Sequence, residues 1–394
     1  DQVAMDIVRS RRQIGEVESD RDALQRLREI RKTLPLPGTS AFEARLQARA
    51  LARISDTYLL EELEWIITGR GLTTREEYLD APRPGRGVAF PPRLRGVVWA
   101  VHQAFQPEKK TERFPDLRNE ALAIVRSGTW KGHWDHVFVD EAQDLSPSAL
   151  SLMAEVCRTP EGLFFAADPK QSLYSRNHGF ASANPRLQFR GRTATLKRNY
   201  RSTAEIDRAA FSLLRPEEAE ALEPSTSIHE GPLPVLVRGA LPAKEPEWVM
   251  RFVRQVAKHL HLRQSAATVL VPTAEIGEAM ATALSDLGLP AKFFAGRNLD
   301  LRQDVVKVLS LFSAKGLEFP IVIACGFHQG TYPVAEDFDD PDLFAERMRH
   351  ERRLLYVAFT RAMRGLMVLI PAGCRHEALT GLDTAQWHVE EGAE

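Results

Sequence analysis

The sequence predicts an α/β protein in which a helical N-terminal segment precedes two α/β domains. The chain has 394 residues, more than one hydrophobic core usually organises, so two compact domains are expected. Over roughly the first hundred residues, apolar side chains recur at helical spacing. After His133, short apolar runs alternate with helical stretches, a pattern typical of parallel strands joined by crossover helices.

Two helical blocks are predicted at the start of the chain. The first covers residues 5–34, with a break expected near Gly15, and a Pro- and Gly-containing stretch ends it. The second covers residues 42–67, after which Thr73 with Glu76 and Thr74 with Glu77 offer alternative capping boxes for a further helix. The loop at residues 81–87 contains arginines, for which we favour a solvated turn over contact with phosphate.

The predicted strands are short apolar runs. The first two cover residues 136–140 and 162–168, and a helical stretch at residues 148–157 separates them. The alternation of strands and helices continues to the end of the chain, which indicates a layered α/β structure. The further predicted strands are residues 234–237, 267–271, 305–311, 321–325 and 365–370, and the further helices are residues 247–261, 276–287 and 345–360.

Composition excludes several classes of protein. Hydrophobic residues make up 44% and charged residues 27%, unlike a disordered, collagen-like or membrane-embedded chain. The net charge is -1, so a basic groove for a polyanion must be local. Cys157, Cys325 and Cys374 form no CxxC pair, so neither a disulfide framework nor a cysteine-rich zinc site is indicated. Without a membrane-spanning run or a signal peptide, the protein is expected to be cytoplasmic.

Acidic residues follow the first two predicted strands. Asp140 and Glu141 end the first, and Asp168 ends the second. Ligands of open parallel sheets bind beyond the carboxyl ends of the strands, so a phosphate site is expected there. An apolar strand followed by Asp-Glu is the Walker B arrangement, in which Asp140 would hold magnesium and Glu141 would polarise the attacking water. Taken alone, the two acids equally suit the start of the following helix.

Five segments, in order, resemble motifs II to VI of the UvrD/Rep-like superfamily 1 helicases. The resemblance extends from residue 137 to about residue 369, and five motifs in the family's order make a chance match implausible. The residues before it match the family only loosely. The segments are DEAQD at residues 140–144, ADPKQSLY at 167–174, LKRNYRS at 196–202, SAKGLEF at 313–319 and ERRLLYVAFTRA at 351–362.

The resemblance implies two RecA-like domains of the P-loop NTPase type, with parallel sheets whose interface closes on ATP and magnesium. It also implies ATP hydrolysis coupled to movement, 3′ to 5′, along single-stranded DNA or DNA with a single-stranded tail. Residues 1–132 would be a helical segment belonging to the first motor domain and its insert. Residues 133–195 would complete the first RecA-like domain, and residues 196–394 would form the second.

The family's nucleotide contacts are implied at matching positions. Tyr200 would stack on adenine and Arg201 would reach the γ-phosphate. Arg361 would stabilise the charge of the phosphoryl transition state. Gln171 would sense the γ-phosphate and relay its presence to bound DNA. Taken without the motifs, these residues would be a core tyrosine, surface arginines and a loop glutamine.

Motif V and motif III supply the remaining implied roles. Gly316 would allow close backbone approach, and Glu318 would accept hydrogen bonds from the ribose hydroxyls. Taken without the motif, Gly316 would be only a turn residue and Glu318 a salt-bridge partner. Tyr174 would stack on a base of single-stranded DNA. Arg176 stands where the family usually has tryptophan, which weakens the stacking platform but keeps a positive charge. Phe312 replaces the family's usual histidine, so no DNA contact is assigned to it.

Two expected features are absent from the sequence. There is no Walker A loop, Gly-x-x-x-x-Gly-Lys-Ser/Thr, whose amides and lysine cradle phosphates. The 110 residues between Ser202 and Ser313 are too few for the family's large accessory insert, so a reduced or missing insert is expected. We favour a Walker A loop in a parent chain before Asp1. The alternatives are a non-hydrolysing DNA-binding or scaffold relative and a subunit of a helicase-nuclease complex.

Overall fold

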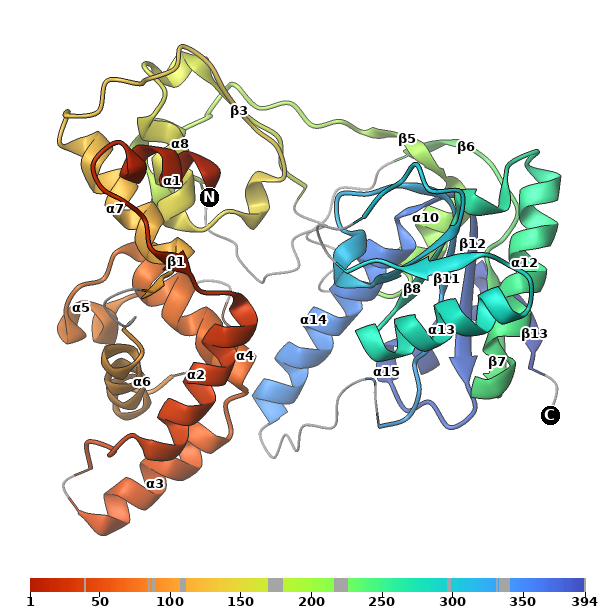
Figure 1. The fold of residues 1–394 in the computed structure, drawn as a ribbon, viewed down its shortest axis with the longest axis horizontal. Coiled ribbons are helices and arrows are strands. Elements are labelled where there is room, and N and C mark those ends of the chain that lie inside the picture. Colours follow the sequence, from red (N-terminus) through yellow and green to blue (C-terminus); the bar gives the residue numbers. More distant parts are fainter. Residues whose placement is uncertain are drawn as a thin grey trace. The chain divides into compact units, whose positions relative to one another are not determined.

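The structure is a computed structural model that describes residues 1–38, 40–83, 86, 90–106, 111–168, 180–215, 226–295, 299–330, 332 and 341–392. Its contacts divide the chain into two compact units (Figure 1). Unit 1 comprises Asp1–Thr193 with Phe338–Glu346, and unit 2 comprises Ala194–Asp337 with Arg347–Glu394. Each unit contains hydrophobic core clusters of its own.

Helices form most of the first part of unit 1. The helices and the two short strands of this part are α1 (Gln2–Arg9), β1 (Glu16–Val17), α2 (Asp20–Thr33), α3 (Ala41–Ala52), α4 (Asp56–Glu61), the π-helical η1 (Glu62–Ile67), η2 (Thr68–Arg70), α5 (Arg75–Asp80), α6 (Pro92–Ala104), β2 (Thr111–Glu112) and α7 (Phe114–Arg126). The break expected near Gly15 is confirmed, because β1 separates α1 from α2 and pairs with β2. The capping box at Thr74 is also confirmed, with Glu77 as its acidic member.

Two arginines of the loop after α5 are buried, which corrects the expectation of a solvated turn. The side chains of Arg83 and Arg86 are 5% and 10% exposed, and both bind the fully buried Glu62. Arg83 Nη2 donates to Glu62 Oε2 at 2.8 Å, and the Tyr78 hydroxyl donates to Glu62 Oε1 at 2.9 Å. Burial alone would raise the pKa of Glu62, but these donors outweigh burial and hold its pKa below the ordinary value.

We expect Tyr78→Phe to lower the free energy of unfolding by about 1 to 2 kcal/mol, because it removes one donor from a buried carboxylate. Urea unfolding checks this. Tyr58→Phe is the matched control, since the Tyr58 hydroxyl meets Arg83 only at 3.5 Å. Equal losses in both variants would contradict the assigned role of Tyr78.

Since the pKa of Glu62 is lowered by folding, the stabilisation that Glu62 contributes is present above its ordinary pKa and is lost as the pH falls through the folded value.

A small parallel sheet completes unit 1. The elements are β3 (Val137–Val139), the 3₁₀ helix η3 (Ala142–Asp144), α8 (Pro147–Glu155), η4 (Pro160–Gly162), β4 (Leu163–Phe165), α9 (Phe180–Ala183) and η6 (Pro185–Leu187). β3 pairs with β4 in parallel, and α8 lies between them in the chain, so the first two predicted strands and their crossover helix are confirmed. Val137, Val139 and Leu163 are buried in a core shared with α1 and α7.

Unit 2 is built on a seven-stranded parallel sheet. Its strand order is β13-β7-β12-β11-β8-β10-β9, and every pairing is parallel. The five strands predicted after residue 230 are therefore confirmed. The strands are β7 (Val235–Ala240), β8 (Ala267–Val271), β9 (Ala291–Phe293), β10 (Val306–Ser310), β11 (Phe319–Ala324), β12 (Ala362–Pro371) and β13 (His388–Glu391), and a side sheet pairs β5 (Arg198–Thr203) with β6 (Thr226–His229).

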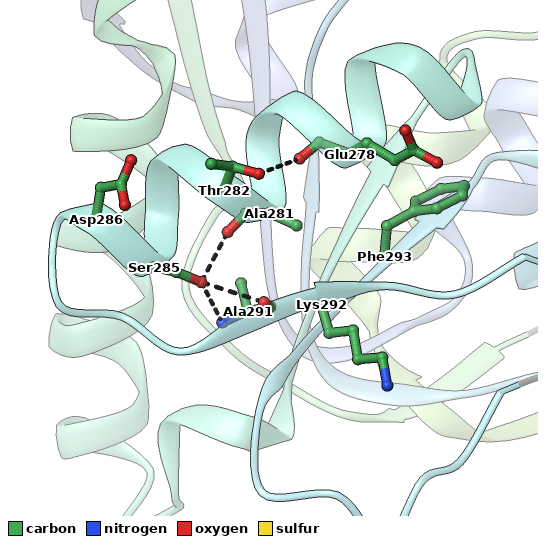
Figure 2. Close-up of a pocket in the computed structure, with 8 residues that line it drawn as sticks. All are labelled: Glu278, Ala281, Thr282, Ser285, Asp286, Ala291, Lys292 and Phe293. Carbon is green, nitrogen blue, oxygen red and sulfur yellow. Dashed lines mark hydrogen bonds between the residues drawn. The ribbon is translucent and has the colours of Figure 1, made fainter.

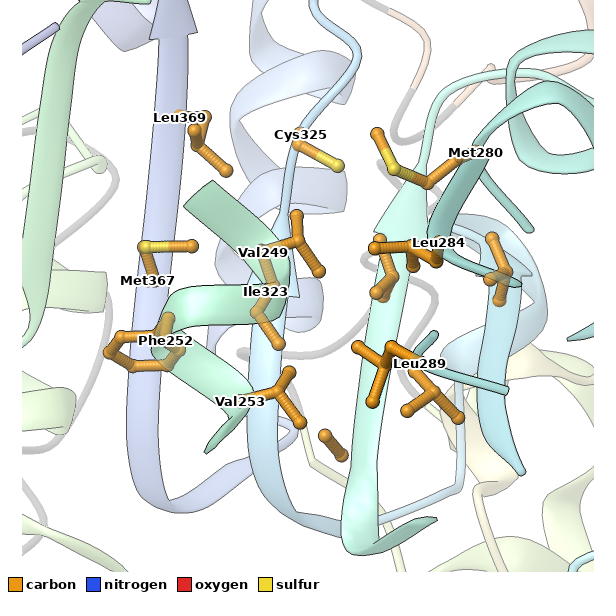
Figure 3. Packing of buried hydrophobic residues seen from close by; sticks show 14 of the residues in the cluster. Val249, Phe252, Val253, Met280, Leu284, Leu289, Ile323, Cys325, Met367 and Leu369 are labelled. Carbon is orange, nitrogen blue, oxygen red and sulfur yellow. The ribbon is translucent and has the colours of Figure 1, made fainter. Parts of the chain in front are cut away.

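Helices cover this sheet and bury its central strands. They are α10 (Ala204–Phe211), α12 (Glu245–His259), α13 (Ala274–Asp286), α14 (Pro341–Phe359) and α15 (Glu377–Thr380). Figure 3 shows the packing: Val249 and Val253 of α12 lie in one core cluster with Ile323 of β11. All five residues of β8 are buried, as expected for a central parallel strand. The predicted α/β fold class is thus confirmed. In the described part of the chain, no helix is both long and apolar enough to cross a membrane.

Candidate nucleotide-binding site

Asp140 and Glu141 lie directly beyond the carboxyl end of β3, as the sequence predicted. Ala142 N–H donates to the carbonyl of Ala166 at 2.9 Å, and Ala166 N–H donates to the carbonyl of Val139 at 2.8 Å. These bonds extend the pairing of the two chain segments past the end of β3. The helix α8 takes its N-cap from Ser146, whose Oγ accepts from Ala149 N–H at 3.2 Å. Ser146 therefore caps α8, and a capping role does not explain why Asp140 and Glu141 follow β3.

Glu141 adopts a left-handed backbone conformation, with φ 50° and ψ 39°. Such a conformation costs a non-glycine residue about 1 to 3 kcal/mol and persists where neighbours enforce it. Asp140 Oδ1 accepts the Glu141 N–H at 2.9 Å. Gln143 Nε2 donates to Glu141 Oε2, while Gln143 Oε1 accepts the Asp168 N–H at 3.0 Å. Sequence reasoning missed Gln143, although it lies within the DEAQD string.

Motif III continues from Asp168 into residues outside the described ranges. Gln171, Tyr174 and Arg176 are all among residues 169–179, so their predicted roles are not tested. The structure ties Asp168, the second residue of motif III, to motif II through the hydrogen bond from Asp168 N–H to Gln143. The positions of the acids and of the start of motif III are therefore fixed by one glutamine side chain.

Unit 2 brings two of the predicted nucleotide contacts together, Arg201 and Glu318. Tyr200 and Arg201 lie on β5, and Glu318 immediately precedes β11. Arg201 Nε forms an ion pair with Glu318 Oε1, with side chains 36% and 40% exposed, and Tyr200 is 62% exposed. Gly316 has φ +74°, and no atom lies within 4 Å of the position of a Cβ there. Glycine is therefore required by the backbone conformation, while the space beside it stays open.

A hydrogen-bond network holds the β5 residues in place. Asn199 Oδ1 accepts the Arg201 N–H at 2.8 Å, and Asn199 Nδ2 donates to Asp207 Oδ2 at 2.7 Å. Arg364 Nη1 donates to the carbonyl of Arg201 at 3.0 Å. Sequence reasoning missed Asn199 and Arg364 as positioning residues. Asn199 stands inside the motif IV string, so its position offered a signal, whereas Asp207 offered none.

Arg361 is buried, with 1% of its surface exposed. Its Nε donates to the carbonyl of Val357 at 2.9 Å, and its Nη1 donates to the carbonyl of Leu317 at 3.3 Å. Its own carbonyl accepts the Phe319 N–H at 3.0 Å. The guanidinium therefore joins the end of α14 to motif V, one residue from Glu318.

The residues fit a magnesium ion that is held mainly by its nucleotide. Among the described residues, no three His, Cys, Asp or Glu side chains are arranged to hold a metal ion. Magnesium in nucleotide enzymes usually takes one or two carboxylates and completes its shell with phosphate oxygens and water. Asp140 is an exposed carboxylate beyond a parallel strand, which meets this requirement.

A surface depression of about 430 Å³ lies at the opposite edge of unit 2's sheet from β13 and contains none of the predicted site residues. Figure 2 shows that its polar groups bind one another: Ser285 Oγ donates to the carbonyl of Ala281 at 2.8 Å, and Thr282 Oγ1 donates to the carbonyl of Glu278 at 3.0 Å. We assign it no catalytic role. Its lining residues are Glu278, Ala281, Thr282, Ser285, Asp286, Ala291, Lys292 and Phe293.

Comparison with known proteins matches two helicase domain families. Residues 101–187 match the UvrD/REP helicase N-terminal domain, and residues 295–371 match the UvrD-like helicase C-terminal domain. The first match contains motifs II and III, and the second contains motifs V and VI. Both matches occur in the order that the motifs predicted.

Similar proteins include DNA helicase II of Escherichia coli, 45% identical over 67 residues, which are 17% of this chain and 9% of that protein. DNA helicase IV of Escherichia coli is 23% identical over 288 residues, which are 65% of this chain and 36% of that protein. The chain thus spans less than two thirds of these relatives' lengths. A solved C-terminal domain of a possible DNA helicase from Lactobacillus plantarum has a TM-score of 0.37 and 22% identity, covering 48% of this chain and 98% of that one, a likeness too weak to support an argument. The two domain families, matched in order, and the DNA helicases among the similar proteins support a UvrD/Rep-like helicase.

Proposed function

We propose that this chain is the motor part of an ATP-dependent DNA helicase that hydrolyses ATP with magnesium and moves along single-stranded DNA. The cluster formed by the Arg201–Glu318 ion pair and the exposed Tyr200, which precedes Arg201 on β5, carries this proposal. An exposed ion pair contributes only about 0 to 1 kcal/mol to stability, so folding alone does not account for the cluster. An exposed aromatic ring, a guanidinium and a carboxylate suit adenine, a phosphate and a ribose hydroxyl.

The acids beyond β3 supply the chemistry in this proposal. Asp140 would hold magnesium, which neutralises charge on the phosphates when it is bound. Glu141 would orient and deprotonate the attacking water. Gln143 fixes one Glu141 carboxylate oxygen, and the left-handed backbone sets the direction in which the side chain leaves the strand.

Arg361 would contact the γ-phosphate only after leaving the carbonyls of Val357 and Leu317. A phosphate would offer the guanidinium an ionised acceptor and a bidentate geometry, which the two neutral carbonyls do not. We further propose that Gln171 signals the γ-phosphate to bound DNA. The domain boundaries after residues 132 and 195 and the reduced accessory insert belong to the same proposal.

We also propose that polypeptide outside the 394 residues supplies the Walker A loop. The sheet of β3 and β4 supports this, because its second face is bare: Phe138 is 76% exposed and Phe164 is 59% exposed. Their rings lie together, with centroids 5.7 Å apart. Parallel sheets are nearly always covered on both faces. A further strand and helix bearing the phosphate cradle would cover these two side chains.

Tyr174→Ala is expected to weaken single-stranded DNA binding by roughly 1 to 3 kcal/mol, because it removes a base-stacking ring. ATP affinity without DNA should not change. Both affinities should be measured in one salt, since phosphate contacts make DNA binding salt-dependent. Phe312→Ala is the control, because Phe312 is 53% exposed and has no assigned DNA contact. Unchanged DNA binding in Tyr174→Ala would remove Tyr174, and with it the neighbouring Arg176, from the proposed DNA-binding residues.

Strand displacement by the full-length protein tests the proposed function. We expect ATP and magnesium to drive displacement of a strand from a duplex with a 3′ single-stranded tail. DNA binding without any ATP hydrolysis would instead identify a non-hydrolysing scaffold protein. Hydrolysis without displacement or movement would contradict the coupling to DNA.

A further inference from the structure

Helix α3 presents an outward face of unpaired arginines. Leu51 is its one buried residue, and it packs in the core with α2 and α6. At 3.6 residues per turn, the side of the helix opposite Leu51 carries a basic and partly apolar stripe. Figure 1 shows α3 at the far end of the helices of unit 1. We name this stripe the α3 face, and its residues are Phe42, Arg45, Leu46, Arg49 and Arg53.

The arginines of the α3 face are exposed and lack protein partners. Within the described ranges, none of Arg45, Arg49 and Arg53 forms an ion pair or a side-chain hydrogen bond. The neighbouring helix α2 behaves differently, because Arg28 and Arg31 both bind Asp56, Arg28 at 2.7 Å. Asp56 is thus bound by α2, and within the described ranges none of the three arginines of the α3 face has an acidic partner.

The spacing of the face suits a repeating anion. Arg45, Arg49 and Arg53 follow at intervals of four residues, so their backbones rise by about 6 Å each along the helix. Arginine pairs with phosphate through a planar fork and carries its charge at every relevant pH. Phe42 is 72% exposed and Leu46 is 45% exposed, and both lie among the arginines. Apolar groups within a row of guanidinium groups fit sugars and bases beside phosphates better than they fit isolated anions.

We propose that the α3 face is an auxiliary site for the DNA backbone, which holds nucleic acid outside the motifs that contact nucleotide. This inference rests on the proposed function, since it takes DNA as the ligand. The face precedes both matched helicase domain families, so neither match assigns it a role. The chain's net charge of -1 cannot supply a general attraction for DNA, so local charge must do so.

The test uses the chain that carries R45Q, R49Q and R53Q together. Its DNA binding is measured by fluorescence anisotropy across a salt series. Three lost phosphate contacts should reduce the slope of log affinity against log salt by about 2.7 for duplex DNA or about 2.1 for a single strand. Affinity at low salt should fall about tenfold or more. Separate single-stranded, blunt duplex and tailed substrates therefore show which form of DNA the face holds.

The matched control replaces Arg251, Arg254 and Lys258 of α12 with glutamine. These cations are also exposed on one helix, and Arg251 binds Glu390 of its own unit at 3.1 Å. Both triple variants change the net charge equally, so a loss confined to the α3 variant supports the proposal. Equal losses would overturn it, because net charge alone would explain them. An unchanged salt slope in the α3 variant would overturn it as well.

Two further experiments distinguish a membrane partner from DNA and distinguish failure of this inference from failure of the proposed function. F42S with L46S and vesicles containing phosphatidylserine test for a membrane surface. Vesicle binding that depends on Phe42 and Leu46, with DNA affinity unchanged in the arginine variant, would overturn the DNA assignment. If the unaltered chain binds no DNA at low salt, the proposed function fails together with this inference. If it binds DNA and the α3 variant binds DNA as the unaltered chain does, this inference alone fails.

Discussion

Glu141→Gln in the full-length protein is expected to reduce ATP hydrolysis by about 10² or more while ATP still binds. Glutamine keeps the size of the side chain but cannot accept the proton of the attacking water. Asp140 remains in place, so its proposed magnesium contact is retained. The amide of residue 141 can still accept from Gln143 through its carbonyl oxygen, so the local geometry should persist.

The informative measurement pairs equilibrium ATP binding with single-turnover hydrolysis. Glu161→Gln is the control, because Glu161 is an exposed carboxylate in η4 of the same unit. We expect it to leave both quantities unchanged. Loss of ATP binding in Glu141→Gln would show that Glu141 has a binding role, and normal hydrolysis would show that another group activates water.

Arg361→Ala is expected to reduce the rate of hydrolysis by about 10³ or more, because an arginine at the departing γ-phosphate stabilises the charge of the transition state. The substitution also removes donors from the carbonyls of Val357 and Leu317, so some loss of stability should accompany the loss of rate. Arg361→Lys separates the two effects. Lysine keeps the charge but lacks the planar fork, so the rate should stay low even where the fold is retained.

Rates and thermal unfolding should be measured on the same preparations. Arg263→Ala is the control, because the Arg263 side chain is 82% exposed on unit 2 and its ion pair with Asp304 is 3.6 Å long. A folded Arg361→Ala protein that hydrolyses ATP at the normal rate would assign Arg361 a purely structural role, in joining α14 to motif V.

The fold of unit 2 followed closely from the sequence, because its central strands are continuous apolar runs. β8, β10, β11 and β12 were predicted within a few residues for that reason. The edge strand β13 was not predicted, since His388–Glu391 is polar and pairs through its backbone alone. β9 was missed for a related reason, because three residues give too short a pattern.

The motifs implied which residues belong to the candidate site, but they did not indicate the contacts between its side chains. Motif order implied Glu141, Arg201 and Glu318, and the structure pairs the last two. The bond from Gln143 to Glu141 depends on a left-handed backbone that no local pattern announces. Burial of Arg86 likewise depends on Glu62, which stands a full helix earlier in the chain.

We propose that this chain holds most of an ATP site but not the phosphate cradle. DNA-stimulated ATPase activity, measured for the 394-residue chain and for a parent protein that continues before Asp1, tests it most directly. We predict negligible turnover for the chain alone, because no preorganised amides hold the β-phosphate, and DNA-stimulated turnover for a parent with a Gly-Lys-Ser/Thr loop. Turnover by the chain alone at about 1 per second or more, the range of working enzymes, would contradict the account.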